Sequence, residues 1–255
     1  MMALAGLVVS GLVAGILLSI EVGYRIGRRR RARLSATAPI VPPTLEASVY
    51  GLMSLLTAFT FYGAGARFDI RRNLIAQEAN AIGTAYLRLD LLPPEAQPVL
   101  RDDFRQYLHS RLAAYRMIPD VKAVNASLER SGALQKQLWS DATEAVKDSG
   151  PAEKALLFTS LNQMIDVTTL RTIALTTHPP AAVFAMLAIT IIASCALAGY
   201  TMSVSAIRDW VSAIAFTLVL GAAVYVILDY EFPRIGLVRI DPVDRVLAET
   251  LKKMN

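Results

Sequence analysis

The residues of this sequence whose types could serve a chemical purpose gather at the end of an aromatic, apolar stretch. Phe59 and Gly63 lie in that stretch, and Arg67 and Arg71 follow it. On one continuous helix the two arginines lie four residues apart and therefore share a face. Because rings of arginine favour anions in pores, one interpretation is a vestibule where cationic side chains meet an aromatic-lined passage. The alternative is an interfacial anchor, in which arginines reach the lipid headgroups beside an aromatic belt.

No motif of an enzyme or of a metal site accompanies these residues. The two histidines, His109 and His178, lie far apart in the sequence, and the single cysteine is Cys195. A zinc or haem site would need further ligands near one of them. The sequence holds no HExxH, paired CxxC, GxSxG, Walker A or GxGxxG pattern. We therefore expect no enzyme activity, no catalytic residues, no metal and no cofactor.

The elements that must position the aromatic and basic residues are four stretches without any charged residue. They are Ala3–Ile20, Ala47–Ala66, Ala181–Ile207 and Trp210–Leu228. A bilayer core needs about 20 apolar residues in a helix, with a range of about 17 to 25. Arginines follow the first stretch instead of preceding it, so we interpret it as a retained membrane anchor and not as a signal peptide.

The third and fourth stretches predict a tight helical hairpin, because only Arg208 and Asp209 separate them. Both arms are rich in alanine, glycine and serine. Small residues let membrane helices approach closely, since lipid provides no hydrophobic drive for their association. We interpret these small residues as packing surfaces and not as a ligand site.

The polar segment between the second and third stretches is predicted to be helical. Prolines divide it into helices over about 67–92, 94–118, 120–149 and 151–178, the third of them interrupted near Ser131. Asp120 suits the cap of the third helix, and Pro151 suits the first turn of the fourth.

One face of the second of these helices is apolar. Leu100, Phe104, Leu108 and Leu112 recur every four residues, which is the spacing of a one-sided helical stripe. We expect this stripe to face a core.

These features predict an all-α integral membrane protein with four transmembrane helices and a helical domain inserted between the second and third. The expected segments are a first transmembrane pair with an arginine-rich loop (1–66), a helical non-membrane domain (67–178), a second transmembrane hairpin (179–228) and a C-terminal tail (229–255). The formal net charge is +5, but arginines concentrate at Arg28–Arg33, directly after an apolar run. That position indicates membrane orientation and a lipid partner, not nucleic acid.

A further set of residues forms a pattern along the chain. Its members are Asp69, Glu78, Asn80, Thr84, Arg88, Asp90, Asn162, Asp166, Arg171, Asp229, Pro233 and Gly236. The pattern resembles a bacterial family of unknown function, the bestrophin-like domain proteins. The resemblance covers most of the chain from about Leu52 onward.

The aromatic second stretch with its following arginines is also similar to bestrophin chloride channels. That similarity implies a homo-oligomer, a pentamer, in which the second helix of each subunit lines a pore. Phe59, with Leu55, Leu56 and Gly63, would then face a path for chloride or other small anions. The arginine-rich first loop departs from the bestrophin pattern.

Two functions follow from this pattern, both for a multi-pass protein of the bacterial cytoplasmic membrane. The first is an oligomeric anion channel, and the alternative is a non-conducting scaffold or sensor whose helical domain binds a partner. A dense arginine cluster tends to stay cytoplasmic, which places the first loop inside and the helical domain outside. Bestrophin topology implies the opposite orientation.

Overall fold

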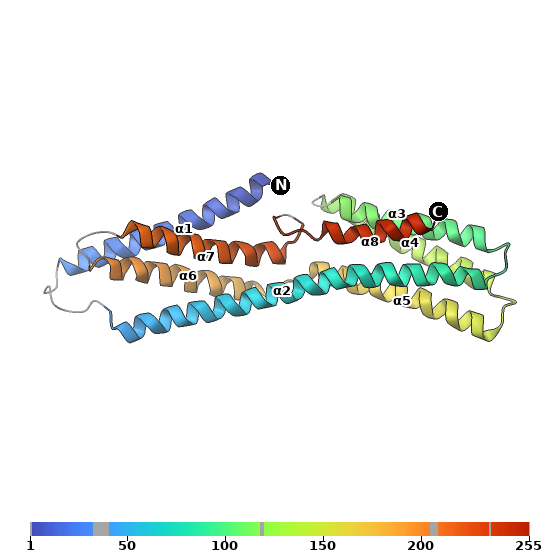
Figure 1. Cartoon of the computed structure of the whole chain (residues 1–255), viewed down its shortest axis with the longest axis horizontal. Helices are drawn as coiled ribbons and strands as arrows, with labels where there is room; N and C mark the ends of the chain where they lie inside the picture. Colours follow the sequence, from blue (N-terminus) through green and yellow to red (C-terminus); the bar gives the residue numbers. More distant parts are fainter. Residues whose placement is uncertain (1, 33–40, 118–119, 205–208, 235, 255) are drawn as a thin grey trace. The chain divides into compact units, whose positions relative to one another are not determined.

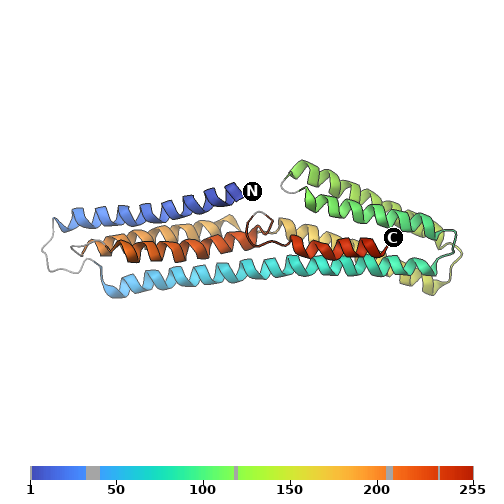
Figure 2. The same cartoon turned by 45° about the horizontal axis from the view of Figure 1, so that its top comes forward.

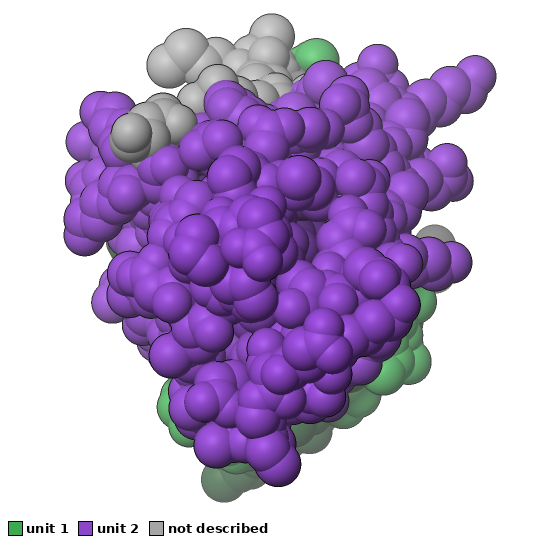
Figure 3. Space-filling view, turned by 90° about the vertical axis from the view of Figure 1, so that its right-hand side faces the viewer, with its two compact units in different colours: residues 1–68, 178–238 green, residues 69–177, 239–255 purple. Residues whose placement is uncertain are grey.

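The computed structural model describes residues 2–32, 41–117, 120–204, 209–234 and 236–254. Within these ranges every regular element is a helix, and no strand occurs. The contacts group the chain into two compact units, which Figure 3 colours separately. Unit 1 comprises Met1–Phe68 and His178–Val238, and unit 2 comprises Asp69–Thr177 and Arg239–Asn255. The four-segment division expected from the sequence stays a prediction.

Unit 1 is built from membrane-spanning helices. They are α1 (Met2–Arg31), the first part of α2 (Pro43–Leu87), α6 (Ala181–Met202) and α7 (Trp210–Glu231). Each contains a stretch long and apolar enough to cross a bilayer. Figures 1 and 2 show α1, α6 and α7 running beside one another. The predicted all-helical fold with four membrane spans is therefore confirmed.

Helices α1 and α6 meet backbone to backbone. A Cβ atom on Gly23 would lie 1.8 Å from the carbonyl oxygen of Ala196, and one on Gly199 would lie 1.8 Å from that of Ile20. Only glycine tolerates such distances, and glycine is the residue that lets membrane helices approach this closely. The small residues of α6 therefore serve its contact with α1. The sequence predicts that these small residues are packing surfaces; Arg208 of the predicted hairpin lies outside the described residues.

The core of unit 1 takes a narrow stripe from every span. Its buried members are Ile16, Ile20, Met53, Ala64, Leu187, Ile191, Cys195, Leu220, Val224 and Ile227. Large apolar side chains on the other faces are exposed, among them Leu18 and Val211. A bilayer is the surrounding that makes such apolar surfaces stable, because lipid chains replace water around them.

Unit 2 is built from shorter and more polar helices. They are the rest of α2, η1 (Arg88–Leu91), α3 (Gln97–Arg116), α4 (Val121–Ala145), α5 (Pro151–Thr176), η2 (Asp241–Asp244) and α8 (Arg245–Lys253). The apolar stripe of α3 is buried at all four expected positions. The C-terminal helix α8 belongs to the same unit, where the Tyr86 hydroxyl donates to the Met254 carbonyl at 2.9 Å.

Two local signals in unit 2 are confirmed. The Asp120 carboxylate accepts from the backbone N–H groups of Lys122 and Ala123, both at 3.1 Å, and so caps α4. Pro151 stands in the first turn of α5, where its missing N–H costs no helical hydrogen bond.

The helices of unit 2 differ from the sequence prediction in their ends and in one predicted break. α2 changes to a 3₁₀ turn at Arg88, because Leu92 must be extended before Pro93 and the chain tightens ahead of it. α3 begins at Gln97, three residues later than expected, and Ile118 lies outside the described residues. α4 is unbroken at Ser131, whose hydroxyl donates to the Ser127 carbonyl at 2.9 Å within the helix.

Side-chain hydrogen bonds join α3 to α4. The Ser110 hydroxyl donates to the Ser127 carbonyl at 3.0 Å, and the Gln137 amide donates to Asp103 Oδ1 at 2.9 Å. Asp103 is 3% exposed and lies beside Asp141. Burial, together with the hydrogen bond and negative charge of Asp141, raises the pKa of Asp103 to about 6.

The raised pKa of Asp103 predicts a pH-dependent stability. The folded state binds a proton that the unfolded chain, with a carboxyl pKa of about 3.9, releases earlier. The protonated carboxyl therefore stabilises unit 2 fully below about pH 4, and this contribution is lost as the pH rises through about 6. Asp103→Asn keeps a neutral side chain at every pH, so its thermal unfolding temperature should fall less than that of the wild type between these limits. Asp102→Asn, on the exposed neighbour, is the control; equal pH profiles for all three proteins would contradict the burial argument.

The buried stripe of α3 predicts a local cost of truncation. Leu108 is fully buried, so Leu108→Ala should lower the free energy of unfolding of unit 2 by about 2–5 kcal/mol. Val99 on the same helix is 58% exposed, so Val99→Ala should change stability by less than about 0.5 kcal/mol. Limited proteolysis of both variants in detergent measures the difference, and equal sensitivity would contradict the register of α3.

Candidate functional site

A buried carboxylate organises one end of unit 1. It belongs to Glu231, the last residue of α7, whose side chain has no exposed surface. Arg67 of α2 donates to Glu231 Oε2 at 2.9 Å, and the His178 Nδ1 atom lies 2.8 Å from Oε1. The Phe232 ring packs against the His178 ring with centroids 5.0 Å apart. A carboxylate withdrawn from water is stable only when paired, so Glu231 fixes the positions of both partners.

The predicted vestibule residue Arg67 is therefore an ion-pair partner as well as a surface group. Its side chain is 25% exposed. A Cβ atom on Gly63 would lie 3.3 Å from Arg67 Nη1, so the glycine leaves room for the guanidinium to fold back along α2. The structure brings these two expected residues together through this contact.

Arg71 lies in a different setting, within unit 2. It is 4% exposed and donates to the carbonyl oxygens of Ala174 at 3.0 Å and Thr177 at 2.9 Å. These carbonyls end α5 and have no helical partner of their own. The charge of Arg71 thus compensates a helix C-terminus, where cations are favoured. Arg71 is therefore a buried structural cation and not an exposed charge of the expected vestibule.

Phe59 lies on the outer face of α2 in unit 1. Its side chain is 65% exposed, and that of Tyr62 is 77% exposed. Among the close backbone contacts between helices, α1 pairs with α6 and α7, whereas α2 has no comparable partner. Large aromatic side chains on a weakly covered membrane helix indicate neighbours from outside the chain, either lipid or other copies.

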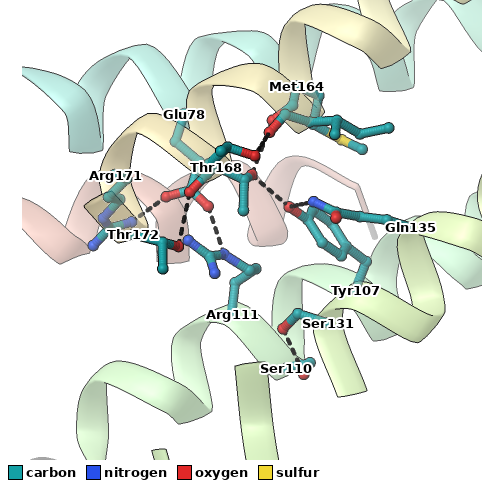
Figure 4. Close-up of polar contacts among 12 residues, drawn as sticks. Glu78, Tyr107, Ser110, Arg111, Ser131, Gln135, Met164, Thr168, Arg171 and Thr172 are labelled. Carbon is teal, nitrogen blue, oxygen red and sulfur yellow. Dashed lines mark hydrogen bonds and ion pairs between the residues drawn. The ribbon is translucent and has the colours of Figure 1, made fainter. Parts of the chain in front are cut away.

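The pattern residues Glu78 and Arg171 meet in the core of unit 2, shown in Figure 4. Arg111 donates to Glu78 Oε1 at 2.6 Å, and Arg171 donates to the other carboxylate oxygen. Arg171 also donates to Asp244 Oδ1 at 2.9 Å. Glu78, Arg111 and Arg171 have at most 2% exposed side chains, so two arginines and two carboxylates form a neutral cluster. This cluster joins α2, α3, α5 and the C-terminal segment.

A neutral hydrogen-bond chain continues beside this cluster (Figure 4). The Thr168 hydroxyl donates to the Met164 carbonyl at 2.9 Å, so its oxygen accepts from the Tyr107 hydroxyl at 2.8 Å. Tyr107 in turn accepts from the Gln135 amide at 3.1 Å. Every buried polar group of this chain therefore has a partner, which fixes α3 and α4 against α5.

Asp229 and Gly236 meet in the turn after α7. Asp229 Oδ2 accepts from the backbone N–H groups of Leu237 at 3.0 Å and Val238 at 2.7 Å. A Cβ atom on Gly236 would lie 1.4 Å from Asp229 Oδ1, so any other residue there would displace the Asp229 carboxylate. These two pattern residues thus shape the turn.

The remaining pattern residues do not converge on one place. Asp69, Asn80 and Thr84 on α2, and Asn162 and Asp166 on α5, are exposed, whereas Pro233 is buried. Arg88 donates to the Leu156 carbonyl, and Asp90 pairs with Arg101. Within the described ranges, no three His, Cys, Asp or Glu side chains lie close enough to hold a metal ion.

Sequence reasoning missed Arg111, Asp244 and the pairing role of Glu231. Arg111 carries a readable signal, since it lies three residues after Leu108 and so in register with the apolar stripe of α3. A charged residue in a buried stripe requires a buried partner. Asp244 offers no such signal, because it lies in a polar tail.

Taken together, the spans of unit 1 and the helices of unit 2 define a multi-pass helical membrane protein. The family model of the bestrophin-like domain matches residues 11–244. The chain belongs to the bestrophin-like domain family.

Solved structures of similar fold are crystal structures of a bacterial bestrophin homologue from Klebsiella pneumoniae. Two single-residue variants of it align with TM-scores of 0.70 and 0.71 at 14% identity, over 96% and 95% of this chain and 98% of theirs. A further similar structure, described as a membrane protein, has a TM-score of 0.71 at 14% identity and covers 97% of this chain and 98% of its own. No curated protein sequence matches significantly.

The Arg67–Glu231 pair predicts non-additive substitutions. Arg67→Met leaves a fully buried carboxylate without its arginine, which should cost about 3–5 kcal/mol of stability. Adding Glu231→Gln to that variant removes the buried charge that Arg67 no longer neutralises and should recover most of the loss. Thermal unfolding in detergent of the two single variants and the double variant measures the coupling. Additive losses would show that the two side chains do not depend on each other.

Proposed function

We propose that this chain assembles into a homo-oligomer that conducts small anions along a path lined by α2. The observation that carries the proposal is the exposed outer face of α2. The family membership and the fold similarity support the same function, which the sequence pattern also implied.

In unit 1 that face is apolar and aromatic. Leu52, Leu55, Phe59 and Tyr62 are each at least 50% exposed and recur every three or four residues, so they share one side of the helix. Repeated around a symmetry axis, they form stacked rings. A hydrophobic ring of this kind constricts and gates a pore by excluding water.

In unit 2 four exposed positions of α2 that continue this face are polar but uncharged. The same helical spacing relates Asn73, Gln77, Asn80 and Thr84. Of these, Asn80 and Thr84 also belong to the family pattern. Amide and hydroxyl groups donate hydrogen bonds to an anion without holding it as strongly as a full charge does. Weak binding of this kind permits passage, because a conducted ion must also leave.

The anion preference that we propose does not depend on an open ring of arginines. The Arg67 charge is paired with Glu231, so its field is reduced along any path beside α2. Aromatic rings carry partial positive charge at their edges, and the edges of Phe59 and Tyr62 can face an anion. Their contribution is local and adds to that of the polar donors.

The orientation in the membrane also belongs to this proposal. Four consecutive arginines, Arg28–Arg31, form the last turn of α1, and Arg30 donates to the Tyr200 hydroxyl at 3.1 Å. Clustered arginines in a short loop favour the cytoplasmic side. A cysteine at Ser149, in a Cys195→Ala background, should then react with impermeant thiol reagents in intact cells. One at Ser35, which lies outside the described residues, should not; reversed labelling would support the opposite orientation.

Ion flux tests the function directly. Phe59→Ala widens the proposed constriction and should raise chloride flux through purified protein in liposomes. Leu218→Ala truncates an exposed side chain of similar setting on α7, at 59% exposure, and should leave the flux unchanged.

The alternative function, a non-conducting scaffold or sensor, makes a distinct prediction. Folded, oligomeric protein with no chloride flux above that of empty liposomes, in the wild type and in Phe59→Ala, would favour it. Arg67→Glu is a poor selectivity test, because it would place a second carboxylate beside buried Glu231.

A further inference from the structure

A cavity opens between α1, α6 and α7 within unit 1. Its volume is about 510 Å³, inside the range of about 300–1,000 Å³ found for ligand sites. The lining comes from the span segments Gly11–Ser19, Phe184–Cys195 and Val224–Leu228. It therefore lies among membrane-spanning helices.

The cavity exists because α1 and α6 touch along only part of their length. At Gly23 and Gly27 of α1, an added Cβ atom would lie within 3 Å of α6 atoms. At Gly11 and Gly15, earlier in α1 and part of the cavity lining, it would meet nothing within 4 Å. The two helices are in backbone contact at one end and separated at the other. The space between them is large enough to hold a ligand.

The cavity lining offers too few hydrogen-bond partners to hold a water molecule. Its hydroxyl group, that of Ser19, already donates to the Gly15 carbonyl at 2.8 Å, and the Cys195 thiol is buried and only a weak donor. A stable internal water needs two to four polar partners. The remaining lining is leucine, isoleucine, valine, phenylalanine, alanine and glycine. The occupant must therefore be apolar.

The mouth of the cavity lies on the outer faces of the helices. Ile192, which lines it, is 56% exposed, and Gly11, Gly15 and Ala188 are exposed as well. Ile189 lies three residues before Ile192 on α6 and outside the cavity lining. Its side chain is 67% exposed and continues the same apolar surface. In a membrane protein this surface faces lipid, so the bilayer itself supplies the chemistry that fits.

We propose that this cavity binds one acyl chain of a membrane phospholipid. The chain enters between α1 and α6 and fills the space beside Gly11 and Gly15 that no side chain occupies. It completes the packing of α1 against α6 where direct backbone contact ends. The inference rests on the membrane fold and is independent of ion conduction.

Photolabelling after removal of bulk lipid tests the proposal. The protein is reconstituted with a phospholipid that carries a diazirine in its acyl chain, exchanged into detergent so that loosely bound lipid leaves, and then irradiated. Peptide mass spectrometry should find the label in Gly11–Ser19 and Phe184–Cys195. The outer face of α7 around Leu218 should lose its label during the exchange.

A matched pair of variants on α6 separates the cavity from the general lipid surface. Ala188→Leu fills the cavity and should abolish labelling of both segments, whereas Ala185→Leu adds the same atoms outside the lining and should not. Gly15→Leu, which has open space for its side chain, is the second filling variant. Unchanged labelling in both filling variants would overturn the proposal.

Discussion

A buried carboxylate that stays ionised is stabilised by a nearby cation, and α2 supplies one partner of such an ion pair in each unit. In unit 1, α2 supplies Arg67 to the buried Glu231 of α7. In unit 2, α2 supplies the buried Glu78 to Arg111 and Arg171. Breaking either pair would leave a charge in a dry interior, so these contacts determine which side of α2 faces its own chain.

The opposite side of α2 is exposed within the part of the chain that the structure describes, and the proposed function follows from that. The helix contributes Met53 and Ala64 to the core of unit 1, while Phe59 and Tyr62 point away from it. A symmetric assembly gives this side neighbours and an axis. Arg67 pairs with Glu231, and Arg71 donates to carbonyl oxygens at the end of α5, so neither is an open charge. In this proposal the anion preference therefore comes mainly from hydrogen-bond donors and ring edges.

Much of the fold could be predicted from the sequence because its signals are local. The four spans follow from run length, the α3 stripe from its period, and the start of α4 from the Asp120 cap. The hairpin between α6 and α7 is predicted only from the short sequence separation of the two apolar stretches. The sequence could not show that Gly199 instead fits against Ile20 of α1, because complementary surfaces far apart in a chain leave no local pattern.

The candidate site was less predictable for the same reason. Glu78 pairs with Arg171 across 93 sequence positions, and Arg171 pairs with Asp244 across 73. A single sequence gives residue types at these positions but not their partners. It likewise placed Arg67 and Arg71 on one helix face correctly, yet it could not say that α5 covers Arg71.

The central claim is that Phe59 faces the ion path and not the surrounding lipid. Accessibility of introduced cysteines measures this most directly, with Cys195→Ala as the background. In liposomes, Phe59→Cys should react with a water-soluble, charged thiol reagent, and the modification should change chloride flux. Leu218→Cys on the outer face of α7 should remain unreactive. If Phe59→Cys is as unreactive as Leu218→Cys in folded, oligomeric protein, α2 faces lipid at this position and the account of the path is wrong.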